Sequence, residues 1–361
     1  MRVADLAAAL RAFGLDVAEL GPCDVDDHEA RVRRLKAEGE KDGSDFAQLA
    51  RDAWESGAVL RESHHHLAAK AYGCAALFML HLGETSEAWA IQRGIDRNAL
   101  AGEPDILAMV DTFAASAAID SGDLAGAKTL ALGAIELLGP PRSREHGAMV
   151  ASARGTYGRA FLHAGEYEEA IVHLAASVEL QERYAAFEAA RSRGYLATAY
   201  RHAGKLDEAR ATIAHALEQN ARDAPKRSAS RQTAPFLHLE AGRVALAQGN
   251  LDDAERHLAE VGTDAARYPD LGADRTRVRA ALRSGDVERA RALAARCATT
   301  ASALPRASAL TQVGAIGFAE LIVAHAATPE DEVRCVALLT HAFDRIVTRE
   351  EVPVLVAAQV F

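Results

Sequence analysis

Apolar residues recur along most of the chain at the spacing of one face of an α-helix, and the strict alternation typical of strands is lacking. The segments 28–41 and 45–60 illustrate the pattern, because they form a predicted helix pair that breaks at Asp42, Gly43 and Ser44. One face of the second segment carries Phe46, Leu49, Ala50, Ala53 and Trp54. The pattern therefore predicts an all-α fold without a sheet.

A six-residue pattern, which begins with glycine and ends with alanine, is repeated along the chain. Its glycines are Gly83, Gly122, Gly165, Gly204, Gly249 and Gly285, and its alanines are Ala88, Ala127, Ala170, Ala209, Ala254 and Ala290. Successive alanines are separated by 39, 43, 39, 45 and 36 residues. A near-constant period of this kind indicates stacked structural repeats, each of which packs on its neighbours.

The residue types in this pattern suit a turn between two antiparallel helices. Glycine ends the first helix because it adopts a left-handed backbone conformation without a side-chain penalty. An acidic residue soon afterwards favours the positive end of the second helix. The alanine is expected where the two helices cross, opposite a mostly small residue twelve positions earlier. Those earlier residues are Ala76, Ala115, Gly158, Ala197, Gly242 and Val278.

Two of the repeats resemble the tetratricopeptide repeat (TPR) family. The first contains Tyr157, Gly158, Phe161, Gly165, Tyr167 and Ala170, and the second contains Leu196, Ala197, Tyr200, Gly204, Leu206 and Ala209. The period is longer than that of the family, and Arg154 stands where its tryptophan is expected. In these respects the chain is more similar to the longer repeats of bacterial regulators and peptide receptors.

The resemblance implies a right-handed superhelical solenoid of antiparallel helix pairs with a concave groove. It divides the chain into an N-terminal helical cap region (1–65), a TPR-like repeat array (66–300), and a C-terminal helix pair with a capping tail (301–361). The final pair is expected at 307–326 and 329–346, and the segment 220–235 is expected to be a mobile loop.

Charge and composition narrow the classes of partner. The formal net charge is −10, which argues against direct nucleic-acid binding. No window approaches the roughly 18 apolar residues of a membrane span, and the first residues are a poor signal peptide. We therefore expect a cytoplasmic protein that binds neither nucleic acid nor membrane.

No catalytic, cofactor or metal motif is found in the sequence. Phosphate-binding glycine loops, nucleophile elbows and paired-cysteine zinc patterns are missing. The run His64, His65 and His66 is interpreted as a solvated helix start, because consecutive helical residues point about 100° apart. Acid pairs such as Glu168 and Glu169 are explained by the helix dipole. We expect no enzyme activity, no cofactor and no metal.

The repeat register places several basic residues on one predicted surface. His81, His163 and His202 occupy equivalent positions near the ends of first helices, where they either stabilise free carbonyls or, as the resemblance implies, line the groove. The arginines at groove positions either bind an anionic ligand or pair with acids such as Glu188 and Glu240. Gly155 and Gly194 suggest open space beside them. The predicted ligand-binding residues are Arg159, His163, Arg191, Thr198, Arg201, His202 and Arg243.

These observations leave three hypotheses of function. The first is a scaffold that binds a protein or peptide, through an acidic segment or a carboxylate, in a groove lined by arginine and histidine. The alternative is a stand-alone bacterial sensor that responds to a peptide, although residues 1–60 show no helix-turn-helix. An enzyme that uses the solenoid as a cavity is the least favoured. Homodimerisation through a terminal helix pair is left open.

Overall fold

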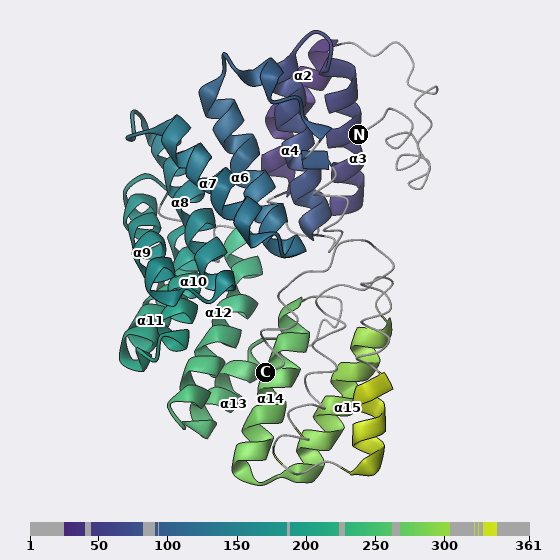
Figure 1. The fold of residues 1–361 in the computed structure, drawn as a ribbon, viewed down its shortest axis with the longest axis vertical. Helices are drawn as coiled ribbons and strands as arrows, with labels where there is room; N and C mark the ends of the chain where they lie inside the picture. The colour runs from purple at the N-terminus through teal and green to yellow at the C-terminus, as the bar shows by residue number, and fades with distance from the viewer. Residues whose placement is uncertain are drawn as a thin grey trace. The chain divides into compact units, whose positions relative to one another are not determined.

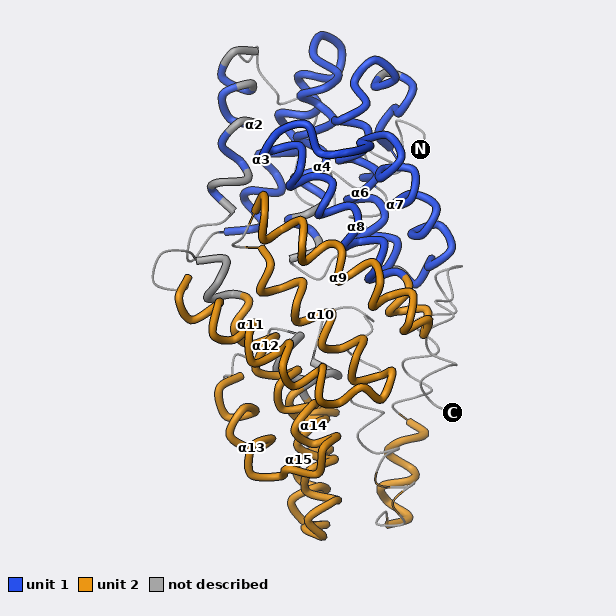
Figure 2. The backbone as a smooth tube through the Cα atoms, turned by 90° about the vertical axis from the view of Figure 1, so that its left-hand side faces the viewer, with its two compact units in different colours: residues 1–160 blue, residues 161–361 orange. Residues whose placement is uncertain are grey.

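The computed structural model describes residues 25–39, 45–81, 91–92, 94–185, 188–223, 228–261, 268–303, 321, 324 and 328–337. Helices and their connecting turns make up these residues, and no strand occurs among them. The chain divides into two compact units, residues 1–160 and 161–361 (Figure 2). The boundary falls within helix α8 (Arg144–Ala164).

The first unit consists of helices that pack on their sequence neighbours (Figure 1). Its elements before α8 are α2 (Val25–Gly39), α3 (Phe46–Leu60), α4 (His65–His81), η2 (Asn98–Leu100), α6 (Pro104–Ser121) and α7 (Leu124–Leu138). Helix α3 packs on α2 and α4, and α6 packs on α7. The helix pair predicted at 28–41 and 45–60 is confirmed by α2 and α3.

The second unit repeats the helix pair. Its elements after α8 are α9 (Tyr167–Tyr184), α10 (Ala189–His202), α11 (Leu206–Asp223), α12 (Ser228–Ala247), α13 (Leu251–Ala259), α14 (Tyr268–Ser284) and α15 (Val287–Ala303). Helix α10 packs on α11, α12 on α13, and α14 on α15. The first helices also contact one another, α10 with α12 and α12 with α14. The predicted all-α solenoid of helix pairs is confirmed.

The recurring glycines end the first helices as predicted. Gly122, Gly165, Gly204, Gly249 and Gly285 all have positive φ, between 77° and 87°. Residues with a side chain adopt this region only at a cost, which explains why glycine is repeated here. Gly83 lies outside the described residues. Polar N-caps follow the turn: the side chains of Asp123, Asn250 and Asp286 accept hydrogen bonds from backbone amides in the next turn.

The recurring alanines lie where the helices of a pair approach closely. Ala127, Ala170, Ala209, Ala254 and Ala290 are each 0% exposed. Their predicted partners twelve residues earlier are buried as well. A Cβ atom placed on Gly242 would lie 3.4 Å from the backbone oxygen of Ala254. The predicted close packing is therefore confirmed for Gly242 and Ala254, and the other described members of these pairs are buried as predicted.

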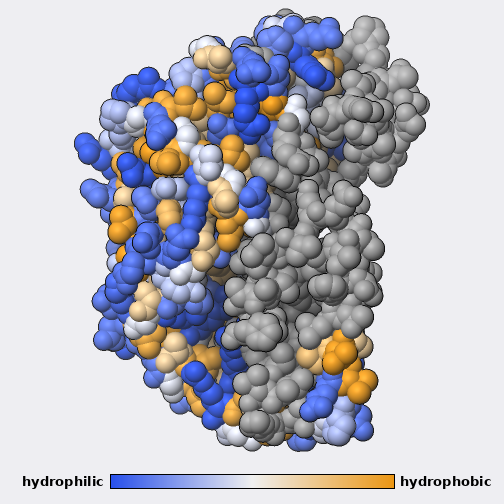
Figure 3. Space-filling model, viewed as in Figure 1, coloured by the Kyte–Doolittle hydropathy of each residue, from blue (hydrophilic) through white to orange (hydrophobic). Residues whose placement is uncertain are grey.

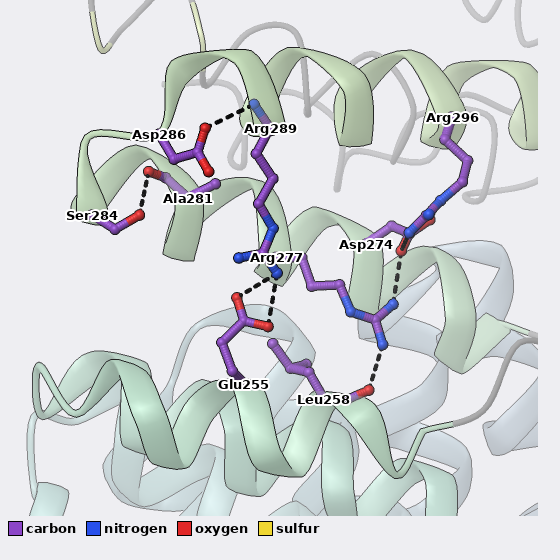
Figure 4. A network of polar contacts seen from close by, with 9 residues as sticks. All are labelled: Glu255, Leu258, Asp274, Arg277, Ala281, Ser284, Asp286, Arg289 and Arg296. Atoms are coloured by element: carbon purple, nitrogen blue, oxygen red, sulfur yellow. Dashed lines mark hydrogen bonds and ion pairs between the residues drawn. The ribbon is translucent and has the colours of Figure 1, made fainter.

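A network of ion pairs supplements this packing between α13, α14 and α15 (Figure 4). Asp274 of α14 accepts two hydrogen bonds from Arg296 of α15, at 2.5 and 2.8 Å, and also pairs with Arg277 at 2.8 Å. Arg277 donates in addition to the backbone oxygen of Leu258 at the end of α13. Asp274 is 9% exposed, so these contacts satisfy a carboxylate that has little access to water.

Two predicted segments differ from the structure or lie beyond its described part. The mobile loop predicted at 220–235 is wrong for most of its length, because α11 continues to Asp223 and α12 begins at Ser228. Pro235 lies inside α12, although proline removes one backbone donor from a helix. Residues 1–24 and most of the predicted terminal pair lie outside the described residues, but 329–337 are helical.

The surface of the described helices is mixed in character. Hydrophilic side chains are interspersed with hydrophobic ones on the face shown in Figure 3. Within the described residues, no helix is long and apolar enough to cross a membrane. His65 is exposed at the start of α4, which agrees with a solvated helix start for the histidine run.

Replacing Ala209 with leucine should overpack the crossing between α10 and α11. Since Ala209 is fully buried, the added carbons have no space, and we expect a loss of roughly 1–3 kcal/mol in the free energy of unfolding. Urea denaturation measures this loss. Ala214→Leu is the matched control, because Ala214 lies on the exposed face of the same helix. Equal stability of the two variants would contradict the assigned role of Ala209.

Candidate functional site

The predicted ligand-binding residues fall into both units. Arg159 lies in the first unit, and the other six lie in the second. Arg159 is half-buried and pairs with Asp120 of α6, at 3.9 Å between Nη2 and Oδ1. This contact agrees with the alternative prediction, in which the arginines pair with acidic residues of neighbouring helices.

A buried carboxylate organises the basic residues of the second unit. Glu240 of α12 is 1% exposed. Its Oε2 accepts a hydrogen bond from Nη2 of Arg201 at 3.2 Å, and its Oε1 accepts one from Nη1 of Arg243. The two guanidinium groups therefore bind different oxygens of one carboxylate.

The helical register explains why these side chains meet. Glu240 and Arg243 are three residues apart on α12, so they lie on the same face. Arg201 lies in the last turn of α10, which packs against α12. Thr198, one turn before Arg201, lies near Glu240, and its hydroxyl donates a hydrogen bond to the backbone oxygen of Gly194 at 3.0 Å. Arg243 extends toward the next first helix, where its Nε lies 3.5 Å from Oγ1 of Thr276 on α14.

The arginines keep Glu240 ionised despite its burial. Burial alone raises the pKa of a carboxyl group, because desolvation disfavours the charged form. The positive charges of Arg243 and Arg201, with the hydrogen bond from Arg243, outweigh this effect and lower the pKa to about 2. Glu240 is therefore negatively charged at neutral pH and balances one of the two guanidinium charges.

His202 lies beside this ion pair as a neutral ring. Its imidazole stacks on Tyr167 of α9, with ring centroids 5.0 Å apart and an angle of 15° between the planes. Its Nε2 lies 3.1 Å from Nη2 of Arg201. Desolvation by its neighbours, and then the charge of Arg201, lower its pKa to about 4, although His202 is exposed to solvent. His202 therefore adds no positive charge at neutral pH.

We define the Glu240 cluster as the residues that the structure brings together here: Thr198, Arg201, His202, Glu240 and Arg243. His163 and Arg191, which were predicted for the same surface, are exposed and are not part of it. Arg191 lies ten residues before Arg201, a distance of about 15 Å along α10. The side chain of His81 lies outside the described residues.

The open space predicted beside Gly194 does not exist in the structure. A Cβ atom on Gly194 would overlap the ring of Phe236 and lie 2.8 Å from Cδ2 of Leu237. Gly194 therefore gives α12 room to pack closely on α10, and no ligand space remains there. The sequence indicated a small residue at this position but not which side chain would fill the gap.

Three residues that contribute to the site were not among the predicted ligand-binding residues. Glu240 was considered only as an alternative partner, yet it is the centre of the cluster. Tyr167 and Thr276 were not predicted. The spacing of Glu240 and Arg243 on one helix was the available signal for the ion pair.

Among the residues that the structure describes, no group of three or more His, Cys, Asp or Glu side chains is arranged to hold a metal ion.

Replacing Glu240 with glutamine should destabilise the protein at neutral pH, because both arginines lose their countercharge. Breaking a buried ion pair costs about 3–5 kcal/mol, and the 26% exposure of the Arg243 side chain favours the lower end. The lowered pKa of Glu240 means that its contribution is complete above pH 4.5 and is lost as the pH falls toward about 2. The difference in unfolding free energy between parent and variant should shrink over that range.

Urea denaturation at a series of pH values tests this expectation. Glu218→Gln is the control, because Glu218 is exposed on α11 and its replacement should change stability little at any pH. A Glu240→Gln variant that is as stable as the parent at pH 7 would show that the ion pair does not stabilise the fold.

Comparisons with known proteins are limited to structure. No family model matches the chain, and no curated protein matches its sequence. The chain is similar to the apo form of RapI, with a TM-score of 0.59 and 12% identity over 91% of this chain and 98% of RapI. It is also similar to a Rap protein complexed with Competence and Sporulation Factor, with a TM-score of 0.58 and 14% identity over 95% of each chain.

A tetratricopeptide repeat protein from Parabacteroides merdae matches with a TM-score of 0.47 and 14% identity, over 88% of this chain and 99% of that protein. At these identities the similarities concern the fold. Together with the glycine and alanine register, the RapI and Rap structures establish that the chain has a tetratricopeptide-like helical-repeat fold.

Proposed function

We propose that the chain is a scaffold that binds a protein or peptide, and that the ligand contacts the Glu240 cluster through a carboxylate or another anionic group. The observation that carries this proposal is the convergence of two arginines from adjacent first helices on one buried carboxylate. Glu240 holds both guanidinium groups in place.

The geometry favours an anionic ligand for two physical reasons. Each guanidinium carries five N–H donors in a rigid plane, which suits carboxylates and phosphates. Within the described residues, the Nε of Arg201 is buried and has no hydrogen-bond partner. Since Glu240 already orients the arginines, a ligand has less side-chain entropy to remove when it binds.

His163 and Arg191 extend the proposed surface for a longer ligand. Both are exposed residues of the second unit, so they are accessible to a segment bound beyond the Glu240 cluster. Arg159 is a proposed ligand contact of the first unit taken by itself. Its pairing with Asp120 is long, at 3.9 Å, and such partly exposed pairs contribute little to stability.

A sensor that responds to a peptide is the second candidate. The structure of a Rap protein with Competence and Sporulation Factor aligns with 95% of this chain, which supports a fold able to hold a bound factor. A sensor would change conformation when its ligand binds, whereas a scaffold would keep one arrangement. Hydrogen exchange of the helices with and without the selected ligand distinguishes these two functions.

Selection from a library of ten-residue peptides, each synthesised with a free and with an amidated C-terminus, tests the proposal. We expect acidic or free-carboxylate peptides to be retained, and their affinity to fall as salt rises. In the triple variant Arg201→Met, Glu240→Leu and Arg243→Met, the charges are removed together so that none is left buried and uncompensated. Binding of a selected peptide should weaken by about 10–100-fold, because each lost charge-assisted hydrogen bond is worth about 1.5–3 kcal/mol.

The matched control is Arg210→Met on α11, because Arg210 is exposed and is not part of the Glu240 cluster. Circular dichroism establishes that each variant is folded. If the library contained no binder, the proposed function would be unsupported. If the selected peptides bound the triple variant as tightly as the parent, the Glu240 cluster would not be the binding site.

A further inference from the structure

Two histidines meet between α12 and α13, a helix pair of the second unit. His238 of α12 and His257 of α13 are both half-buried. Their Nδ1 atoms lie 3.3 Å apart, and their ring centroids lie 5.6 Å apart with 42° between the planes. The two residues are 19 positions apart in sequence, so the helix pairing itself brings the rings together.

The separation of the two nitrogens matches the spacing of metal ligands. Zinc binds imidazole nitrogens at about 2.0–2.1 Å in a tetrahedral arrangement, which places two such nitrogens about 3.3 Å apart. A direct hydrogen bond between nitrogens is the competing explanation, in which one ring donates and the other accepts. Its usual length is shorter, because hydrogen bonds from N–H groups cluster near 2.9–3.0 Å.

Glu260 is placed to supply a third ligand. It follows His257 by three residues, immediately after the last residue of α13, and residues at this spacing lie on one helix face. Its side chain is exposed and free to change rotamer. In the described part of the chain, no three such groups already surround one point. A metal site here therefore requires the two histidines in their present positions and a rotation of the Glu260 side chain toward them.

The surrounding charges permit a cation at this position. Arg256 is the neighbouring positive charge, but it pairs with Asp253 on the same helix. Glu260 supplies negative charge near both rings.

We propose that His238 and His257 bind a transition-metal ion of the zinc class, with Glu260 as the third ligand and water in the remaining position. Imidazole and carboxylate ligands suit Zn²⁺, whereas Mg²⁺ and Ca²⁺ favour sites made of oxygen atoms. The ion links α12 to α13. His238 lies two residues before Glu240, so their side chains point to nearly opposite sides of α12, and the metal site is separate from the Glu240 cluster.

Titration calorimetry with Zn²⁺ at pH 7.5 tests this site. The starting protein is the full chain with His64→Ala, His65→Ala and His66→Ala, so that the histidine run contributes no heat to the titration. We expect a zinc site that is lost in His238→Asn and in His257→Asn. Loss of a direct ligand should weaken binding by more than the roughly 10–100-fold that changes around a metal site cause. Glu260→Gln should weaken binding without abolishing it.

His215→Asn is the matched control, because His215 is exposed on α11 and its replacement should leave zinc binding unchanged. Mg²⁺ should give no heat at the same concentration. Absence of zinc binding in the starting protein, or binding that persists in the folded His238→Asn and His257→Asn variants, would overturn the proposal and leave a simple hydrogen bond between the rings. Unaltered affinity in Glu260→Gln would overturn its assignment as a ligand.

Discussion

Close packing of small residues at the helix crossings is the constraint on which the rest of the structure depends. The recurring alanines are fully buried, and an ideal Cβ at Gly242 would already lie 3.0 Å from Leu258. Interiors packed this densely cannot absorb an extra side chain without moving a helix. The glycine turns with positive φ complete the unit, because they reverse the chain within a few residues and bring each second helix back along the first.

The same packing determines which polar groups meet. Once α10, α12 and α14 contact one another, side chains of successive first helices come within reach. Arg201 and Glu240 are 39 positions apart in sequence, whereas the repeat that relates α10 to α12 spans 45 residues, from Ala209 to Ala254, so the two side chains do not occupy matching register positions. A carboxylate buried at that position needs positive partners, since an unpaired buried charge is far more costly than a paired one. The ion pair therefore depends on the packing of α10 on α12 and not on the repeat period.

The sequence predicted the repeat but not the contacts made across it. Glycine and alanine positions could be predicted because their physical reasons are local: a backbone conformation and a lack of side-chain volume. The partner of Arg201 could not be chosen between Glu188 and Glu240, because periodicity specifies a helix face and not the rotamer or the neighbour across it. Phe236 beside Gly194 and the helical start of α12 depend on packing between pairs, which outweighs the turn-forming residues around Pro235.

The charge balance of the Glu240 cluster sets what kind of group it can hold. His202 is neutral at pH 7 because its pKa is lowered to about 4, and Glu240 is ionised, so two guanidinium groups share the one carboxylate of the cluster. A ligand carboxylate would add hydrogen-bond acceptors for the guanidinium donors, whereas an ammonium group would add only donors. A ligand with several charges would need further partners, and the exposed His163 and Arg191 offer these only in weakly interacting, solvated positions. The cluster that we propose as the binding site therefore suits an anionic group better than a cationic one.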